Sequence, residues 1–280
     1  MRSSLKRLTS DIYDLLFVLW IYLSASWRHY GWRRRLRFQR YGIVESNQTG
    51  MKQSLLFIRH GQTTWNVEHR LPGQLPGILL NDTGRQQAAR LVDALSALPI
   101  SAFISSPLER ARETAEIMAQ PRHLAIQLEP GLMDIDVGHW AGQNHDELNK
   151  NDETWKAFVK NPTVAPPDVE TFPQVQARAV AAVEHWRAQK ESGTYPAFVA
   201  HADVIKLLLA HYTGLEAGQA GKLVIDNSSI SIVEVEDDKQ PRIVAISWNP
   251  KPGWLEAPKT ETERKQSEAI LAGDEKVPQE

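Results

Sequence analysis

Short apolar runs alternate with amphipathic stretches along the middle of the chain, and this alternation limits the possible folds more than any other feature. The apolar runs have the length of buried strands, and the stretches between them repeat apolar residues at helical spacing. Such alternation predicts an α/β fold, in which a largely parallel sheet lies between helices. The predicted strands are 54–58, 102–104 and 197–200, and the predicted helices are 83–98, a segment from 107, 173–190 and 203–212.

Two further runs, 230–235 and 242–248, flank turn residues at 237–241 and predict an antiparallel hairpin. Together with the parallel strands, the hairpin gives a mostly parallel mixed sheet in a three-layer α/β/α domain. The segment from Ser106 to Glu109 has the pattern of a capping box, which places Pro107 at the start of its helix.

The charge balance and the absence of cysteine exclude several classes of function. Thirty-two Lys and Arg oppose 34 Asp and Glu for a formal net charge of −2, so no overall field attracts nucleic acid. With no cysteine, the chain has no disulfide, no thiolate nucleophile and no cysteine-bound metal. Because the sequence also lacks a metal-binding motif, we expect no metal, no cofactor and no nucleic-acid partner.

The first fifty residues differ from the rest of the chain. An apolar run at 15–25 lies between Lys6-Arg7 and a basic stretch at 28–40. Even the longer span 12–27 has only 16 residues, whereas a transmembrane helix needs about 20. Three interpretations stay open: a membrane anchor, a helix packed on the protein itself, and a non-native extension ahead of a true start at Met51.

These patterns divide the chain into an N-terminal extension, 1–50, a central domain, 51–250, and a C-terminal tail, 251–280. The tail is rich in Lys, Glu, Pro and Gln and poor in large apolar residues, so we expect it to be mostly disordered. We expect a cytoplasmic protein. If the extension touches a membrane through residues 12–40, its arginines keep the domain on the cytoplasmic face.

Basic residues follow three of the predicted strands. Arg59 and His60 come directly after the first strand, His201 follows the strand at 197–200, and Arg110 lies in the first turn of the helix after 102–104. Ligands of open α/β sheets bind beyond the carboxyl ends of the strands. The sequence therefore predicts that these four side chains meet at one site, with the polar Gln62, Thr63 and Asn66 nearby.

Phosphoryl transfer through a phosphohistidine is the chemistry that uses such a set. A neutral imidazole is a competent nucleophile near pH 7, because its ordinary pKa is about 6.5. Two guanidinium groups can bind the phosphate oxygens bidentately, and amides at a helix N-terminus can add to the same anion site.

Five blocks of sequence resemble one known family. They are LLFIRHGQTTWN at 55–66, GRQQA at 84–88, SSPLERARETA at 105–115, GLMDIDVGHWAG at 131–142 and VAHADVIKLLL at 199–209. In order and spacing they resemble the phosphoglycerate mutase-like proteins of the histidine phosphatase superfamily, over about residues 51–248.

The resemblance implies that His60 is the phosphorylated nucleophile. It also implies that the phosphoryl group is bound by a set of polar side chains and a helix N-terminus. These phosphate-binding residues are Arg59, Gln62, Asn66, Arg110, His201 and Ala202.

The general acid of the family is usually a Glu in the block that aligns with LMDIDVGHW, where this sequence has Asp134. The acid must protonate the leaving oxygen and then activate water. Asp134 is our first choice, although its side chain is one methylene shorter. Asp203 is the alternative, because a carboxylate two residues after the second histidine resembles the donor of the acid phosphatase branch. If Asp203 has only a structural role, its negative charge would stabilise the N-terminus of its helix.

The activity expected from this resemblance is that of a phosphomonoesterase acting on a small phosphorylated metabolite. Mutases of the family resemble one another in a Glu-Ser pair after the RHG motif, where this chain has Gln62-Thr63. The segment 144–168, which we expect to cover the pocket, contains Trp155, Lys156, Phe158 and Lys160 and indicates an anionic substrate with an apolar part. The alternatives are a phosphoglycerate-type phosphomutase and a catalytically weak, membrane-tethered binding module. The oligomeric state is not predicted.

Overall fold

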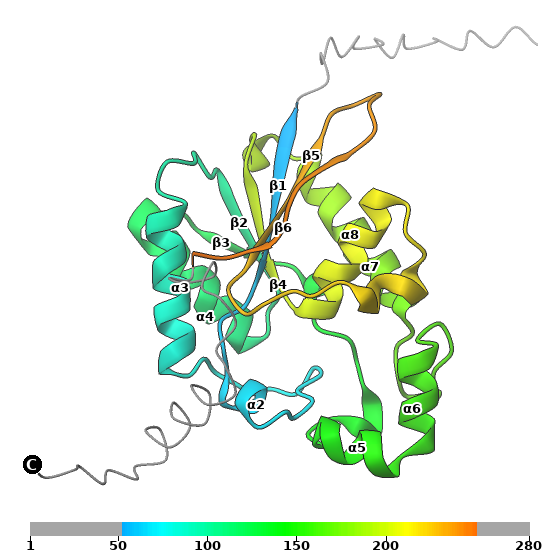
Figure 1. Ribbon diagram of the computed structural model, residues 1–280. Coiled ribbons are helices and arrows are strands. Elements are labelled where there is room, and N and C mark those ends of the chain that lie inside the picture. The colour runs from blue at the N-terminus through cyan, green and yellow to red at the C-terminus, as the bar shows by residue number, and fades with distance from the viewer. Residues whose placement is uncertain (1–51, 251–280) are drawn as a thin grey trace, which may run out of the picture. The chain divides into compact units, whose positions relative to one another are not determined.

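The computed structural model describes residues 52–250, in which six strands form one sheet in the order β3-β2-β4-β1-β5-β6 (Figure 1). The strands are β1 (Gln53–Arg59), β2 (Ala102–Ser105), β3 (Ile126–Leu128), β4 (Pro196–Ala200), β5 (Ile230–Val235) and β6 (Arg242–Trp248). The helices are α2 (Thr64–Val67), α3 (Asp82–Ala94), α4 (Glu109–Ala119), α5 (His145–Asn151), α6 (Glu153–Lys160), α7 (Phe172–Arg187) and α8 (Ala202–Thr213).

The pairing of the strands confirms the predicted mixed sheet. β1 pairs with β4, β4 with β2, and β2 with β3, all in parallel. β5 runs antiparallel to β1, and β6 runs antiparallel to β5, so the predicted hairpin is present. The ends of β1, β2 and β4 therefore lie at one edge of the sheet, each followed by residues of the predicted site.

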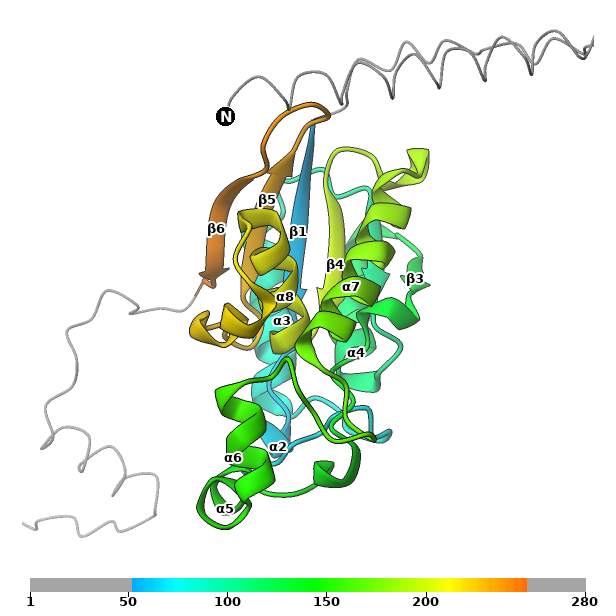
Figure 2. The ribbon, with the colours of Figure 1, turned by 90° about the vertical axis from the view of Figure 1, so that its right-hand side faces the viewer.

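Helices cover both faces of the sheet, which confirms the three-layer arrangement (Figures 1 and 2). Successive side chains of a strand point to opposite faces, and β1 shows this directly. Leu55 and Phe57 pack in the core cluster that contains α7 and α8, whereas Leu56 and Ile58 pack in the cluster that contains α3 and α4. Because β1 is buried on both faces, it is a rigid support for the residues that follow it.

Helix α4 begins later than the sequence pattern predicts. Its first residue is Glu109, and the residue before it, Leu108, makes no side-chain cap. The Ser106 hydroxyl accepts a bond from the Leu108 amide (3.3 Å) but also contacts His201 Nε2 (2.9 Å). The predicted capping box is therefore wrong, because Ser106 belongs to the strand end and is turned toward the neighbouring strand.

Helices α5 and α6 lie beyond the carboxyl edge of the sheet, near α2 (Figure 2). A short backbone ladder joins the start of this segment to the loop after α2. The Leu71 amide donates to the Gln143 carbonyl (2.9 Å), and the Gly142 amide donates to the Leu71 carbonyl (2.7 Å). The His145 amide donates to the His69 carbonyl at 2.7 Å. The two helices are thus attached to the α2 loop beside the carboxyl edge.

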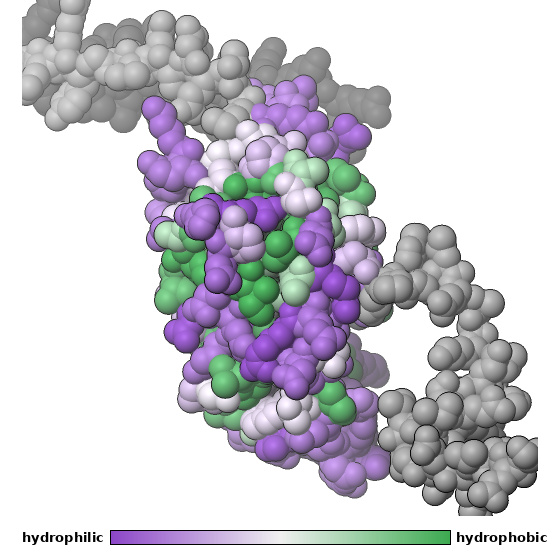
Figure 3. Space-filling model, turned by 90° about the vertical axis from the view of Figure 1, so that its left-hand side faces the viewer, coloured by the Kyte–Doolittle hydropathy of each residue, from purple (hydrophilic) through white to green (hydrophobic). Residues whose placement is uncertain are grey.

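On the side of α3 and α4 the surface is largely hydrophilic, with an apolar area in its middle (Figure 3). No helix within residues 52–250 is long and apolar enough to cross a bilayer. The predicted N-terminal extension, its contact with a membrane and the predicted C-terminal tail lie outside the described residues and stay predictions.

Candidate active site

His60 is fixed in place by the strand that precedes it and by its neighbours. Its amide donates to the Ala200 carbonyl at the end of β4 (3.0 Å). Its carbonyl accepts from the Ser228 amide (3.1 Å) and from Asn227 Nδ2 (3.2 Å), both in the loop before β5. The backbone of His60 is therefore held from both sides, and the residue is only 2% exposed.

The imidazole of His60 has a defined tautomer. His60 Nδ1 lies 2.7 Å from the Gly61 carbonyl oxygen. Because a carbonyl can only accept a hydrogen bond, the proton resides on Nδ1 and Nε2 carries the lone pair. Burial, reinforced by the positive charges of Arg110 and Arg59, holds the pKa of His60 well below its ordinary value. At neutral pH the ring is therefore an uncharged nucleophile that presents Nε2.

The segment after His60 is packed so closely that glycine is required where helix α3 meets it. The Gly61 amide donates to Thr114 Oγ1 (3.0 Å), and Thr114 in turn donates to the Arg110 carbonyl (2.8 Å). A Cβ atom on Gly84, at the start of α3, would lie 2.1 Å from the Gln62 carbonyl oxygen. Helix α3 therefore packs directly against the backbone that follows the histidine. This close approach explains why the GRQQA block begins with glycine.

Two arginines lie beside His60, and each has hydrogen-bond donors without a partner. Arg110 Nη2 donates to Asp134 Oδ2 (2.9 Å) and to the Gly73 carbonyl (2.8 Å). Arg59 Nη1 donates to the Ile225 carbonyl (2.6 Å). Within residues 52–250, Arg110 Nε and Nη1 and Arg59 Nε are buried and bond to nothing. Buried donors are rarely left unpaired, so this set has the chemistry of a site for an anion.

His201 closes the other side of the cluster, at the N-terminus of α8. Its ring centre lies 5.2 Å from that of His60, and its Nδ1 lies 3.6 Å from Asp134 Oδ2. Burial, with the nearby positive charge of Arg110, holds the pKa of His201 well below its ordinary value. Burial raises the pKa of Asp134, although its bond to Arg110 opposes the change.

Ser106 is the hydrogen-bond partner of the His201 ring. The Ser106 hydroxyl lies 2.9 Å from His201 Nε2 and also accepts a bond from the Leu108 amide (3.3 Å). Because a hydroxyl can both donate and accept, this contact holds the ring in place whichever nitrogen carries the proton. The other ring nitrogen, Nδ1, lies 3.6 Å from the carboxyl of Asp134.

A cavity of about 580 Å³ opens onto this cluster. Arg59, His60, Asn66, Asp134 and Ala202 line it, as the sequence predicts for a common site. Arg110 and His201 are completely buried and are not among the residues that line it. Helix α8 begins at Ala202, which lines the cavity, so the free amides of its first turn lie at the cavity as well.

Gln62 does not lie with the other predicted residues. Its Oε1 atom accepts a bond from Asn81 Nδ2 (3.0 Å), and Gln62 is absent from the lining of the cavity. The Gln62 side chain therefore supports the start of α3, where Asn81 is the N-cap. Its contact with a phosphoryl group stays a prediction.

Comparisons with known proteins agree on the family. The sequence model of the histidine phosphatase superfamily (branch 1) matches residues 55–249. The chain belongs to the histidine phosphatase superfamily. A probable phosphoglycerate mutase, GpmB from Escherichia coli O1:K1 / APEC, is 34% identical over 182 residues, which cover 64% of this chain and 84% of that protein.

Solved structures of the histidine phosphatase superfamily have the same fold. YhfR from Bacillus stearothermophilus is 32% identical, with a TM-score of 0.64 over 70% of this chain and 96% of that one. A mycobacterial glucosyl-3-phosphoglycerate phosphatase in complex with VO3 is 27% identical, with a TM-score of 0.64 over 71% and 100%. These names support a phosphatase or a mutase as the activity of this histidine phosphatase.

The two candidate acids of this histidine phosphatase have different surroundings. The Asp134 side chain is 12% exposed and lies against Arg110 and His201. The Asp203 side chain is 33% exposed and is paired with Lys206 Nζ at 2.9 Å. Asp134 is therefore the candidate that contacts the cluster of arginine and histidine side chains, and burial raises the pKa of its carboxyl.

The outer part of the cavity contains residues that the sequence reasoning missed. Trp155 and Phe158 line it as expected, whereas Lys156 and Lys160 do not. His145, the first residue of α5, also lines the cavity. The unpredicted lining residues include Trp65, His69, Arg70, Ile135, Val137 and Phe172. Trp65 comes from α2, Phe172 comes from the start of α7 and the others come from loops, so no single periodic pattern marks them in the sequence.

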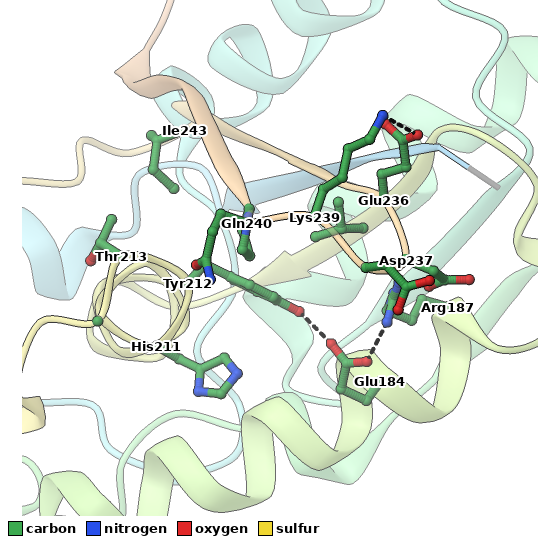
Figure 4. A pocket seen from close by; sticks show the side chains of 14 residues that line it. Glu184, Arg187, His211, Tyr212, Thr213, Glu236, Asp237, Lys239, Gln240 and Ile243 are labelled. Carbon is green, nitrogen blue, oxygen red and sulfur yellow. Dashed lines mark hydrogen bonds and ion pairs between the residues drawn. The ribbon is translucent and has the colours of Figure 1, made fainter. Parts of the chain in front are cut away.

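A second cavity, of about 650 Å³, lies beside the β5–β6 turn (Figure 4). Val235, in its wall, pairs with Gln53 at the start of β1, so this cavity is at the opposite edge of the sheet. The Tyr212 hydroxyl donates to Glu184 Oε1 (2.9 Å), and Arg187 bonds to Glu184 (2.7 Å) and Asp237 (3.3 Å). These charged groups pair with one another, and the cavity therefore lacks the arrangement of nucleophile and anion-binding donors found around His60.

Proposed function

We propose that the protein is a metal-independent phosphomonoesterase that acts through a phosphohistidine intermediate. The observation that carries the proposal is the state of His60: a neutral ring with its lone pair on Nε2, next to two guanidinium groups that have buried, unpaired donors. Arg59, Arg110, His201 and the N-terminus of α8 would bind the three non-bridging oxygens of the phosphoryl group.

The reaction has two steps. His60 Nε2 attacks phosphorus, the bond from phosphorus to the ester oxygen breaks, and protonated Asp134 gives its proton to the leaving alcohol. Asp134, now ionised, then takes a proton from water, whose oxygen attacks the phosphohistidine and releases inorganic phosphate and free His60. Since these side chains provide the nucleophile, the positive charge and the proton, the mechanism requires no metal.

Two observations support a phosphatase rather than a phosphomutase. Gln62 and Thr63 occupy the positions where mutases of the family resemble one another in Glu and Ser. The outer wall of the cavity is formed largely by aromatic and aliphatic side chains, whereas a mutase must hold its charged, dephosphorylated intermediate for a second attack. The similarity to a probable phosphoglycerate mutase makes mutase activity the alternative outcome of the test.

The test is hydrolysis of para-nitrophenyl phosphate by the full chain in the presence of EDTA. We expect activity that EDTA leaves unchanged and that His60→Ala abolishes, while the exposed His211→Ala retains it. Rapid quenching should trap an alkali-stable, acid-labile phosphoenzyme in the wild type only. An undiminished rate in His60→Ala would refute the mechanism, and interconversion of phosphoglycerates without phosphate release would establish the mutase.

A further inference from the structure

The cavity in front of His60 has two chemically different sides. Polar and charged groups surround the nucleophile, as described above. The opposite wall is formed by aromatic and aliphatic side chains from α6, the start of α7 and the loops nearby. The residues of this apolar wall are Leu71, Ile135, Val137, Trp155, Phe158 and Phe172.

The aromatic part of the wall is rigid and offers no hydrogen-bond donor. The ring centres of Trp155 and Phe158 lie 6.1 Å apart, as do those of Phe158 and Phe172. Trp140 packs behind both residues of α6, 5.1 Å from Trp155 and 5.5 Å from Phe158. The indole N–H of Trp155 is used by Asn149 Oδ1 at 2.8 Å. Trp155, Phe158 and Phe172 are 5%, 6% and 7% exposed, so the wall offers the cavity a small apolar surface in a fixed arrangement.

The polar groups of the outer cavity are accessible to solvent. His69 and His145 are exposed, and both interact with Asp146, at 3.0 Å and 3.7 Å. Arg70 lies over the ring of Trp65, 4.0 Å from its centre, and donates from Nε to the Gly142 carbonyl (3.0 Å). Asp203 and Lys206 also line the cavity and are paired with each other at 2.9 Å. Each of these polar groups thus already has a neighbour within the protein, which makes it a poorer partner for the hydroxyl groups of a sugar or a glycerate.

We propose, on the basis of the proposed function, that the protein selects phosphomonoesters whose alcohol part is bulky and apolar, such as an alkyl chain or an aryl ring. A polyhydroxylated alcohol would lose hydrogen bonds to water against this wall and regain few of them. An apolar alcohol gains from each methylene that it buries, by up to about fourfold in affinity per group.

Binding of alkyl phosphonates tests the proposal without requiring turnover. Ethyl, butyl and hexyl phosphonate and a 2,3-dihydroxypropyl phosphonate are titrated into the full-length His60→Ala variant, with intrinsic tryptophan fluorescence as the readout. We expect hexyl phosphonate to bind at least tenfold more tightly than ethyl, and the dihydroxypropyl compound to bind more weakly than butyl. Equal affinities along the alkyl series, or preference for the dihydroxypropyl compound, would overturn the inference.

A matched pair of substitutions locates the effect. Val159 is 53% exposed, on α6, and lines the cavity, whereas Val244 is 55% exposed, on β6, and lies outside it. We expect Val159→Asp to reduce the ratio of hexyl to ethyl affinity at least threefold and Val244→Asp to leave it unchanged. An unchanged ratio in Val159→Asp would overturn the placement of the alcohol. Chain-length dependence of binding combined with absent hydrolysis would instead contradict the proposed phosphatase function alone.

Discussion

The two buried histidines should make the stability of the protein depend on pH. Both His60 and His201 have pKa values far below the ordinary 6.5, because burial and nearby arginines oppose a positive charge on either ring. As the pH falls below 6.5, the unfolded chain binds protons at these positions and the folded protein does not. Stability is therefore present above that pH and is lost as the pH decreases.

The size of the effect follows from the unfolded-state pKa. Between pH 7 and pH 5, a histidine that stays neutral in the folded protein lowers the free energy of unfolding by about 2 kcal/mol, and the pair lowers it by about 4 kcal/mol. Asp134 acts in the opposite direction, because its folded-state pKa is raised and its burial becomes less costly as it is protonated. Since Asp134 is present in every protein compared, its contribution largely cancels.

The assay is urea denaturation at pH 7 and pH 5 of the wild type and of the double variant His60→Asn, His201→Asn. The cavities left by the substitutions change the absolute stability, so the readout is the difference between the two pH values. We expect the double variant to lose about 4 kcal/mol less than the wild type over this range, and the exposed His211→Asn to behave as the wild type. An equal loss in the wild type and the double variant would refute the reasoning.

Three further predictions concern single positions in and around the site. Asp134→Asn should lower kcat by at least about 100-fold and Asp203→Asn by less than about tenfold, and the reverse order in steady-state assays would move the acid to Asp203. Ser106→Ala should lower kcat about tenfold and change the Nδ1 and Nε2 nitrogen NMR shifts of His201, whereas the equally buried Ser105→Ala should leave the shifts unchanged. Gly84→Ala should destabilise the fold by roughly 3 kcal/mol in urea denaturation, since its Cβ would overlap the Gln62 carbonyl.

The elements that the sequence predicts well are those with a strong apolar period and a clear end. The hairpin strands agree with the predicted bounds, and helix α8 differs from them by one residue at each end. His60 and His201 are found because each follows an apolar run of the sheet, and the carboxyl ends of parallel strands meet at one edge. For His60 and His201, the local sequence pattern is therefore enough to predict the position in the folded protein.

The parts that sequence reasoning missed depend on partners far along the chain. β3 has three residues, one half-buried and two exposed, so it has no apolar period to detect. Helices α5 and α6 have only seven and eight residues, too few for an apolar period to be recognised, and they begin at the side-chain caps of Asn144 and Asp152. The sequence around Ser106 is typical of a helix cap. Only its hydrogen bond to His201, 95 residues further along the chain, shows its other role.

The short backbone ladder between residues 69–71 and 142–145 joins two parts of one cavity that differ in how they are built into the fold. The side that faces the phosphoryl group is built from strand ends, whose neighbours in the chain form the core, so most substitutions there would cost both folding and chemistry. The apolar wall is formed by α6, the start of α7 and nearby loops, and the segment that carries α5 and α6 is attached to the α2 loop mainly through main-chain bonds, with side-chain bonds from Arg70 and Asn144. Sequence drift in this segment can therefore change which alcohol is accepted while the chemistry at His60 stays the same.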